Sequence, residues 1–289
     1  MAILADENTT ILIQGITGRE AASMSREMLD YGAKVVAGVT PGKGGEKVHG
    51  IPVYDTVAEA CAKHHPTAAV VSVPARMAKD AVMEAAAHEI RLAVVLTERI
   101  PKQDVIEMVA YAGSRRMRII GPNSPGIISP GKTRLGYLGG SNPERAFLPG
   151  PAGVISRSGG MTTEVANLLH RHGRRPRCRV HLPRLLSPVR GRPRDPGDRA
   201  LRGPGGSKEE VLATKLGKEF KKPVVVFVGG KFVDRMPGTR FGHASVIVRP
   251  GSGSGSAGDK VRRFREAGAE VVDRYSELPE AVRKALKEF

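Results

Sequence analysis

Residues 10–20, TILIQGITGRE, decide the fold of this chain. An apolar run from Thr10 is typical of a short strand, and Gly15 opens a turn that leads into a helix. A strand, a glycine turn and a helix N-terminus together form a phosphate cradle, because free backbone N–H groups and the helix dipole face the anion. Thr17 lies between the two glycines of the turn, Gly15 and Gly18, so the three-glycine pattern of dinucleotide sites is missing. The stretch predicts a Rossmann-like domain but not an NAD site.

The second predicted strand, residues 34–40, supports the same conclusion. NAD-binding Rossmann domains place an acidic residue at the end of this strand to bind the ribose hydroxyls. Here the strand is followed instead by the loop PGKGG at 41–45, which carries one cation, Lys43. This loop favours a phosphate-rich ligand over NAD, and a solvated surface turn is the alternative.

Strands and helices then alternate along the chain. The predicted elements are a helix at 57–63, a strand at 68–74, a helix at 75–89, a strand at 92–98, a helix at 102–116 and a strand at 118–123. This alternation predicts a parallel, doubly wound sheet. Three strands end in polar or proline-containing turns at 73–75, 97–98 and 121–123, which we expect to line one rim of the sheet. Residues 129–150, rich in Gly and Pro, are predicted to link this domain to a second one.

The second domain is predicted to begin with another strand, turn and helix start, at residues 153–164. Ser156, Ser158, Gly159 and Gly160 lie at this turn, where they form an oxyanion or phosphate nest. An ordinary capping box is the alternative interpretation of the two serines.

A long apolar run, PVVVFVGG at 223–230, predicts a strand buried on both faces of a parallel sheet. Ligands of open α/β sheets bind in loops at the carboxyl ends of such strands. His243 follows in this loop beside Gly242, which allows the backbone to approach a reacting group closely. A lone loop histidine is more often solvated and idle, so its local sequence alone does not assign it a role.

Composition narrows the class of protein. The chain has 289 residues, 40% of them hydrophobic and 26% charged, and no run of about 18 apolar residues, so we expect a two-domain protein that does not enter a membrane. The N-terminus lacks the basic region of a signal peptide. Cys61 and Cys178 lie far apart, which predicts neither a disulfide framework nor a zinc site and suggests a reducing cytoplasm. We expect no metal ligands in this chain.

Basic charge is concentrated in one segment. The net charge is +17, and residues 171–202 contain eleven arginines against two acidic residues, Asp195 and Asp198. The segment has no aromatic residue to stack on bases, which argues against a nucleic acid as the partner. A mildly basic remainder suits a protein that handles phosphorylated small molecules.

Five motifs in order give the chain a family resemblance. They are GITG at 15–18, TPGKGG at 40–45, GPNSPG at 121–126, SRSG at 156–159 and GHA at 242–244. In this order they resemble the α subunits of succinate–CoA ligase (succinyl-CoA synthetase), over residues 1–170 and 207–289.

The resemblance implies an α/β fold with two domains. Residues 1–128 correspond to a Rossmann-like domain that binds coenzyme A, 129–150 to a linker, and 151–289 to a flavodoxin-like parallel α/β ligase domain. The residues implied in CoA binding are Thr17, Gly18, Arg19, Glu20, Lys43, Leu96, Thr97 and Glu98. His243 matches the phosphorylated histidine of the family, and Ser156, Ser158, Gly159 and Gly160 match its substrate and phosphate site.

The resemblance also implies a reaction and a partner. Succinyl-CoA, phosphate and a nucleoside diphosphate are interconverted with succinate, CoA and a nucleoside triphosphate, through succinyl phosphate and a phosphohistidine. A β subunit carries the nucleotide, ADP or GDP, and its Mg²⁺, and we expect the complex in the cytoplasm of a bacterium. Two alternatives remain open: a related NDP-forming acyl-CoA synthetase or citrate-cleaving enzyme, and a CoA- or nucleotide-binding regulatory module with affinity for nucleic acid.

The chain departs from the family pattern in two places. Ser124 stands where the family has a cysteine. Residues 171–206 lack the family's helix and its strand ending in Gly-Glu-Ile-Gly-Gly, and no glutamate occurs between Glu164 and Glu209. In the family this glutamate orients the histidine. We hypothesise a frameshift in a GC-rich coding sequence, with a natural basic insertion as the alternative; sequencing the coding DNA distinguishes the two.

Overall fold

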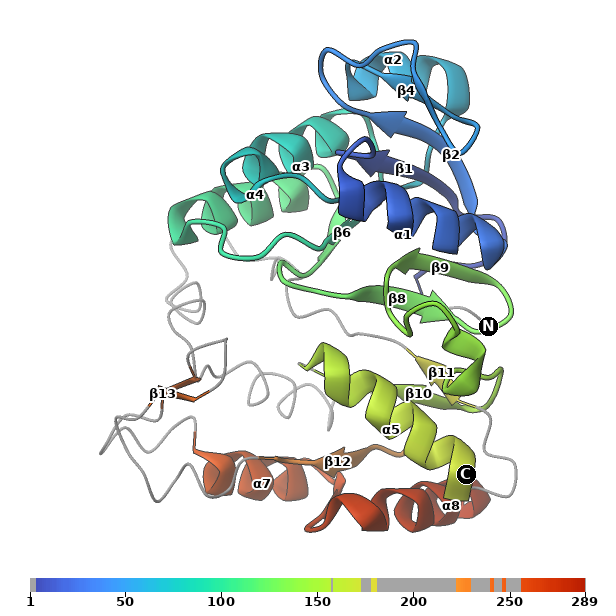
Figure 1. Ribbon diagram of the computed structural model, residues 1–289. Coiled ribbons are helices and arrows are strands. Elements are labelled where there is room, and N and C mark those ends of the chain that lie inside the picture. The colour runs from blue at the N-terminus through green and yellow to red at the C-terminus, as the bar shows by residue number, and fades with distance from the viewer. Residues whose placement is uncertain are drawn as a thin grey trace. The chain divides into compact units, whose positions relative to one another are not determined.

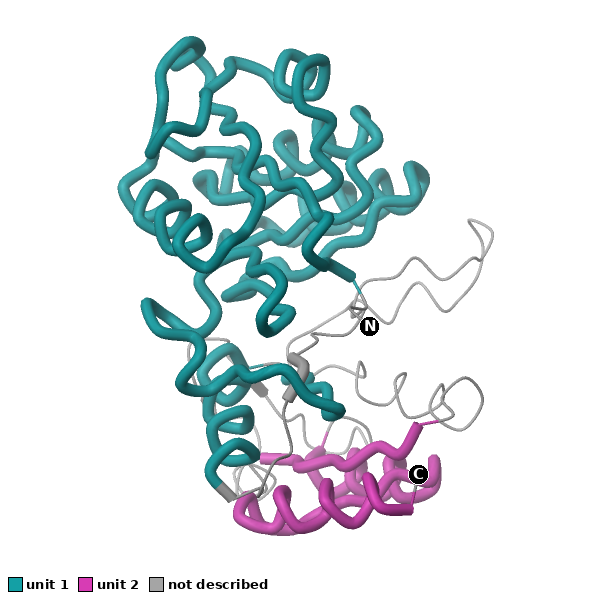
Figure 2. Tube along the Cα trace, turned by 90° about the vertical axis from the view of Figure 1, so that its right-hand side faces the viewer, with its two compact units in different colours: residues 1–190 teal, residues 191–289 magenta. Residues whose placement is uncertain are grey.

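The structure is a computed structural model, and it forms two compact units, residues 1–190 and 191–289 (Figure 2). The residues that the structure describes are 4–156, 158–172, 178–180, 222–229, 240–241, 246–247 and 256–288.

A seven-stranded sheet forms the centre of the first unit, in the order β3-β4-β2-β1-β5-β6-β7. Its strands are β1 (Thr10–Gln14), β2 (Lys34–Val39), β3 (Lys47–Val48), β4 (Ile51–Tyr54), β5 (Ala68–Val71), β6 (Leu92–Val95) and β7 (Arg118–Ile120). All neighbours pair in parallel except β3, which is antiparallel to β4. Without β3, the strands follow the doubly wound order 3-2-1-4-5-6, with the switch point between β1 and β5. The predicted Rossmann-like domain is confirmed.

Helices cover both faces of this sheet (Figure 1). They are α1 (Arg19–Asp30), α2 (Val57–His64), the 3₁₀ turn η1 (Ala75–Met77), α3 (Ala78–Ala87) and α4 (Lys102–Ser114). Successive strand residues point to opposite faces. In β1, Leu12 therefore packs with residues of α2, α3 and α4, whereas Ile11 and Ile13 pack with Met24 and Met28 of α1. This double burial explains why the strands are continuous apolar runs.

A hairpin of β8 (Gly126–Ser129) and β9 (Thr133–Gly136) packs on the face of the sheet that α1 covers. The 3₁₀ turn η2 (Pro143–Arg145) follows it. Ile127 and Leu135 join the apolar cluster beneath α1. Arg134 is 1% exposed and donates from Nη2 to Glu27 Oε2 of α1 at 2.9 Å. Burial lowers the pKa of Arg134, and the Glu27 charge opposes that shift. The first part of the predicted link is thus a hairpin packed on the sheet domain.

The next strand, β10 (Ala152–Val154), leads into α5 (Gly159–His172), as the sequence predicted. β10 pairs in parallel with β11 (Cys178–Val180). Residues of the segment that departs from the family pattern therefore form a strand here.

The second unit has a small parallel pair, β12 (Val225–Phe227) and β15 (Glu270–Val272), together with α7 (Ala257–Glu266), the 3₁₀ turn η5 (Tyr275–Glu277) and α8 (Leu278–Glu288). A short antiparallel pair, β13 (Arg240–Phe241) and β14 (Val246–Ile247), completes its described elements. Phe264 and Ala269 form a core against Val224, Val226 and Val228. The α/β fold class is confirmed. The prediction that the β12 run is buried on both faces is wrong, because its residues are half-buried.

The predicted loop that carries His243 lies outside the described residues. Among the residues that the structure describes, no helix is long and apolar enough to span a membrane.

Candidate functional site

The turn after β1 lies at the switch point of the sheet, between the ends of β2 and β5. Gly15 has φ +82°, and a Cβ at this position would overlap the carbonyl oxygen of Ser72, at the end of β5. Its N–H donates to Val39 O at 2.7 Å, and Gly18 N donates back to Gly15 O at 3.0 Å. Only glycine combines this backbone conformation with this close approach, so the shape of the turn depends on Gly15.

Helix α1 begins at this turn without a side-chain cap. Its N-cap residue is Gly18, which forms no side-chain cap hydrogen bond, and Gly18, Arg19 and Glu20 are all exposed. The first N–H groups of a helix have no partner within the helix, and an uncapped start leaves them for an external acceptor. Together with the positive end of the helix dipole they suit a phosphate group.

The loop after β2 is tied to this turn through two threonines. Thr17 Oγ1 donates to Thr40 Oγ1 at 3.2 Å, and Thr40 Oγ1 donates to Val39 O at 2.8 Å. Because β1 and β2 are neighbours, the two loops leave the same edge of the sheet. The hydroxyl pair fixes the distance between them.

An aspartate shapes the loop that carries Lys43. The Asp55 carboxylate accepts the N–H groups of Lys43 at 3.0 Å and Gly44 at 2.9 Å, and a Cβ at Gly44 would lie 2.5 Å from Asp55 Oδ2. Lys43 Nζ lies 2.9 Å from Glu46 Oε1, with both side chains 50% exposed. The ammonium group is thus held by an exposed partner that a ligand can displace, on a loop that leaves the same edge of the sheet as the turn at 15–18.

The rim after β6 combines buried and exposed residues. Leu96 is 5% exposed and belongs to the core, so it offers a ligand its backbone only. Thr97 Oγ1 donates to Val73 O at 2.8 Å, and Asn123 N donates to Thr97 O at 3.0 Å. Thr97 thus joins the ends of β5, β6 and β7, while Glu98 is exposed.

The structure brings the sequence-predicted binding residues to one edge of the sheet. Residues 17–20, Lys43 and residues 96–98 follow the carboxyl ends of β1, β2 and β6. In open α/β sheets this edge is where ligands bind.

The turn before α5 is built differently. Ser156 Oγ accepts the N–H of Ser158 at 3.1 Å, and Ser158 Oγ accepts the N–H of Met161 at 3.4 Å. A Cβ at Gly159 would lie 2.7 Å from Pro125 Cγ, whereas Gly160 has open space around it. Ser158 therefore acts as a cap, and the contact between Pro125 and Gly159 sets the start of α5 beside the loop that follows β7.

One residue near the rim was not predicted from the sequence. Tyr137 follows β9 and is 46% exposed. Burial, and then the negative charges of Glu98 and Glu20, raise the pKa of its phenol. The signal that could have found it is an aromatic residue inside the glycine-rich stretch at 136–140.

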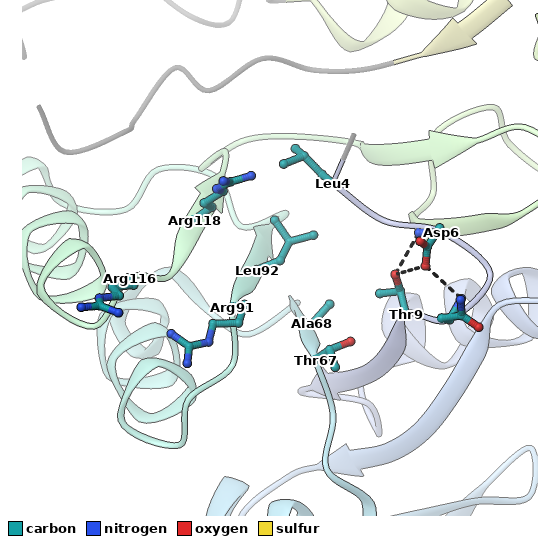
Figure 3. Close-up of a pocket in the computed structure, with 10 residues that line it drawn as sticks. Leu4, Asp6, Thr9, Thr67, Ala68, Arg91, Leu92, Arg116 and Arg118 are labelled. Atoms are coloured by element: carbon teal, nitrogen blue, oxygen red, sulfur yellow. Dashed lines mark hydrogen bonds between the residues drawn. The ribbon is translucent and has the colours of Figure 1, made fainter. Parts of the chain in front are cut away.

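A cavity of about 440 Å³ lies at the other edge of the sheet (Figure 3). It is bordered by residues that precede β1 and by residues that precede or begin β5, β6 and β7, among them Arg91, Arg116 and Arg118. The three arginine side chains extend in different directions in Figure 3 and do not converge on one point. The cavity is separate from the predicted binding residues. Within the described parts of the chain, no group of three or more His, Cys, Asp or Glu side chains is placed to hold a metal ion.

Comparison with known proteins identifies the family. The CoA binding domain family matches residues 6–99, which contain all the residues predicted to bind CoA. The α subunit 1 of ADP-forming succinate–CoA ligase from Archaeoglobus fulgidus is 40% identical over 298 aligned residues, which cover 99% of both chains. The chain belongs to the succinate–CoA ligase α-subunit family. It is thereby assigned to ligases that form carbon–sulfur bonds, and the resemblance seen in its five motifs is confirmed.

Further relatives extend this family assignment. The corresponding succinate–CoA ligase α subunit of Staphylococcus epidermidis is 35% identical, covering 99% of this chain and 96% of its own. Among solved structures, ATP citrate lyase from Methanothrix soehngenii, in complex with citrate and coenzyme A, superposes with a TM-score of 0.80 at 25% identity. The match covers 99% of this succinate–CoA ligase family chain, which spans about half of the lyase chain (51%).

Proposed function

We propose that this chain is the α subunit of a working succinate–CoA ligase, which binds coenzyme A at the carboxyl edge of its sheet and carries a phosphoryl group on His243. A β subunit supplies the nucleotide, ADP or GDP, with its Mg²⁺. The site of action is the cytoplasm of a bacterium. The uncapped start of α1 at the switch point of the sheet is the observation that carries the CoA site, and the Lys43 loop beside it supports the same ligand.

The chemistry divides one difficult transfer into two easier ones. Inorganic phosphate attacks the thioester carbonyl of succinyl-CoA, the carbon–sulfur bond breaks, and CoA leaves as a thiolate that takes up a proton. An imidazole nitrogen of His243 then attacks the phosphorus of succinyl phosphate, and succinate leaves with the electrons of the phosphorus–oxygen bond. The phosphohistidine finally passes the phosphoryl group to the nucleoside diphosphate on the partner subunit.

The turn before α5 suits the phosphate group that takes part in these reaction steps. Its helix N-terminus provides backbone donors, and the space around Gly160 admits a ligand. Charge on the transferring phosphoryl group is spread over its oxygens, so fixed N–H dipoles stabilise it without reorganising. Ser156, Ser158, Gly159 and Gly160 are the residues that we assign to this role.

The assignment of the nucleophile is tested by phosphorylation. With a β subunit and labelled ATP, the chain should acquire an acid-labile label, and His243→Asn should abolish both the label and turnover. Asparagine has no nucleophilic nitrogen of this kind. His88→Asn, at an exposed histidine after α3, is the matched control and should retain both. A label that survives in His243→Asn would refute the assignment.

The segment at 171–206 is tested in the same assay. We expect a chain in which residues 171–204 are replaced by a family-like helix and strand, with its glutamate, to be phosphorylated much faster than the chain as it stands. An orienting carboxylate fixes the tautomer of a reacting imidazole and raises its basicity. Equal rates for the two chains would show that the segment does not matter for catalysis.

The second candidate is a citrate-cleaving enzyme or another NDP-forming acyl-CoA synthetase. The similarity to the ATP citrate lyase structure favours it. The two candidates differ in the carboxylic acid that they join to CoA, so CoA-thioester formation should be measured with succinate, acetate and citrate side by side. Turnover with succinate alone supports the first proposal, and turnover with citrate or acetate alone supports the second.

A further inference from the structure

The inference concerns Tyr137, the half-exposed residue after β9, and it rests on the proposed CoA site. The position of Tyr137 follows from how β9 is attached to α1 (Figure 1). Arg134 of β9 is anchored to Glu27 of α1. Glu20 lies seven residues before Glu27, which is two helical turns and about 10 Å along the same face of α1. Three residues of extended chain, from Arg134 to Tyr137, span about 10 Å as well.

Because the two lengths are equal, Tyr137 is expected beside Glu20, and the charges that act on its phenol agree with this position. Glu20 and Glu98 both act on its phenol. β9 thus runs back along α1 from Glu27 toward the helix start, and Tyr137 arrives beside Glu20. This is the helix end that we assign to phosphate binding.

A second set of contacts attaches Tyr137 to the rim after β6. A Cβ at Gly136, which has φ +101°, would lie 3.2 Å from Leu96 Cδ2. Tyr137 N donates to Pro125 O at 2.9 Å. The backbone of Tyr137 is thus held to the loop after β7, next to the Leu96 side chain, and its own side chain remains 46% exposed.

The order of the strands gives the direction of a bound CoA. Lys43 follows β2 and the phosphate-binding turn follows β1, so the phosphate-bearing end of CoA belongs on this side of the sheet. The thiol end must reach the reaction site at the start of α5. The contact between Pro125 and Gly159 places that start beside the loop after β7, at the opposite side. The arm that joins the two ends therefore passes the residues after β6, where Tyr137 lies.

We propose that Tyr137 contacts the pantetheine arm of coenzyme A and holds it against the rim between the phosphate-binding turn and the start of α5. The pantetheine arm is a flexible chain of methylene and amide groups without charge. An aromatic ring offers such a chain a large apolar face with few rotatable bonds to immobilise. A tyrosine phenol is neutral at neutral pH, and burial raises the pKa of this one further, so the ring adds no charge that would repel the phosphates.

The test compares two ligands of different length. Coenzyme A and adenosine 3′,5′-bisphosphate share the phosphorylated adenosine, but only coenzyme A has the pantetheine arm. Binding of both should be measured by calorimetry on the full chain assembled with a β subunit. Tyr137→Ala should lower the affinity for coenzyme A about tenfold, because it removes an apolar contact. It should leave the affinity for the bisphosphate unchanged. Tyr137→Phe should keep the affinity for coenzyme A, and Lys43→Ala should weaken both ligands.

Ile106→Ala is the matched control, since Ile106 on α4 is an apolar residue of similar exposure, 41%. It should change neither affinity. Equal weakening of both ligands by Tyr137→Ala, or no weakening of either, would overturn the inference, provided that melting temperature shows the variant to be folded. Failure of the unmodified complex to bind coenzyme A would refute the proposed CoA site itself and Tyr137's role with it. If Tyr137→Phe lowers the affinity for coenzyme A as much as Tyr137→Ala does, the hydroxyl and not the ring makes the contact, and the proposed ring contact is wrong.

Discussion

Two turns of the first unit lead from a strand into a helix, and they are built on opposite principles. The turn before α1 has no side-chain cap and depends on the backbone shape that Gly15 allows. The turn before α5 is closed on itself, with Ser156 and Ser158 accepting N–H groups of their own turn. A ligand meets free donors at the first turn, whereas at the second it must compete with a serine. The first turn thus offers a phosphate more free donors than the second.

The largest expected effect is on the shape of the first turn. Gly15→Ala places a Cβ onto the Ser72 carbonyl at a positive φ, and should lower the free energy of unfolding by about 3 kcal/mol. Gly160→Ala, in the open helix start of the second turn, should raise it by about 0.5 kcal/mol. Denaturant unfolding of both variants measures the difference. Similar effects at the two glycines would contradict the contrast between the turns.

The next effect concerns the Asp55 carboxylate, which fixes the loop beside the first turn. Asp55→Ala frees the N–H groups of Lys43 and Gly44, and should cost about 1.5 kcal/mol of stability, near the low end for hydrogen bonds to a charged group. We expect coenzyme A affinity to fall as well, because Lys43 loses its fixed position. Asp30→Ala, at an exposed acid at the end of α1, is the control and should change neither quantity measurably.

A smaller effect is expected from the Lys43 ammonium itself. Lys43→Ala should lower the affinity for coenzyme A about tenfold, or about 1.4 kcal/mol. The effect is no larger because Glu46 already pairs with the Lys43 charge. Phosphorylation of His243 by a nucleoside triphosphate should continue. Glu46→Gln removes the competing carboxylate and should strengthen coenzyme A slightly. Unchanged affinity in Lys43→Ala would exclude Lys43 from the site.

The smallest effect is expected at the second turn. Ser158→Ala removes the cap of α5 and should lower the free energy of unfolding by about 1 kcal/mol, the usual value for a lost N-cap. Ser158→Asn should restore most of it, because asparagine is also a good N-cap. If Ser158→Ala is neutral for stability and yet prevents phosphorylation, the serine is a ligand contact rather than a cap.

The sheet could be predicted from the sequence because its strands are buried on both faces. Continuous apolar runs such as residues 68–71 and 92–95 mark the strands β5 and β6 directly. The short strands β3 and β4 were missed, since Lys47–Val48 and Ile51–Tyr54 offer too few residues for a pattern and the second contains Pro52. Local periodicity fails at such lengths.

The hairpin β8–β9 was missed for a different reason. Its Gly and Pro residues are typical of a loop, and its stability depends on distant partners. Arg134 is the clearest case, because arginine is rarely buried and the charge of this one is paired with Glu27 of α1, while its Nη1 donates to Gly140 O. Nothing in the sequence near residue 134 reveals that partner.

The candidate site could be predicted in part. The turn at 15–18 has a local signature, and the structure shows the predicted helix start, which has no side-chain cap. What the sequence could not show is how each residue takes part. Leu96 is buried and can offer only its backbone, Thr97 clamps the ends of neighbouring strands, and Ser158 caps a helix. These distinctions depend on contacts between segments far apart in the chain.

The donors at the start of α1 belong to the main chain, and every amino acid except proline brings such a donor with it. Mutations at Arg19 or Glu20 thus alter the surface of the turn without deleting the main-chain donors of the helix start. Mutations at Gly15 leave every donor in place but destroy the shape that aims them. Natural substitutions should therefore be found first at the exposed side chains of this turn, and Gly15 should be the residue of the turn that is substituted least.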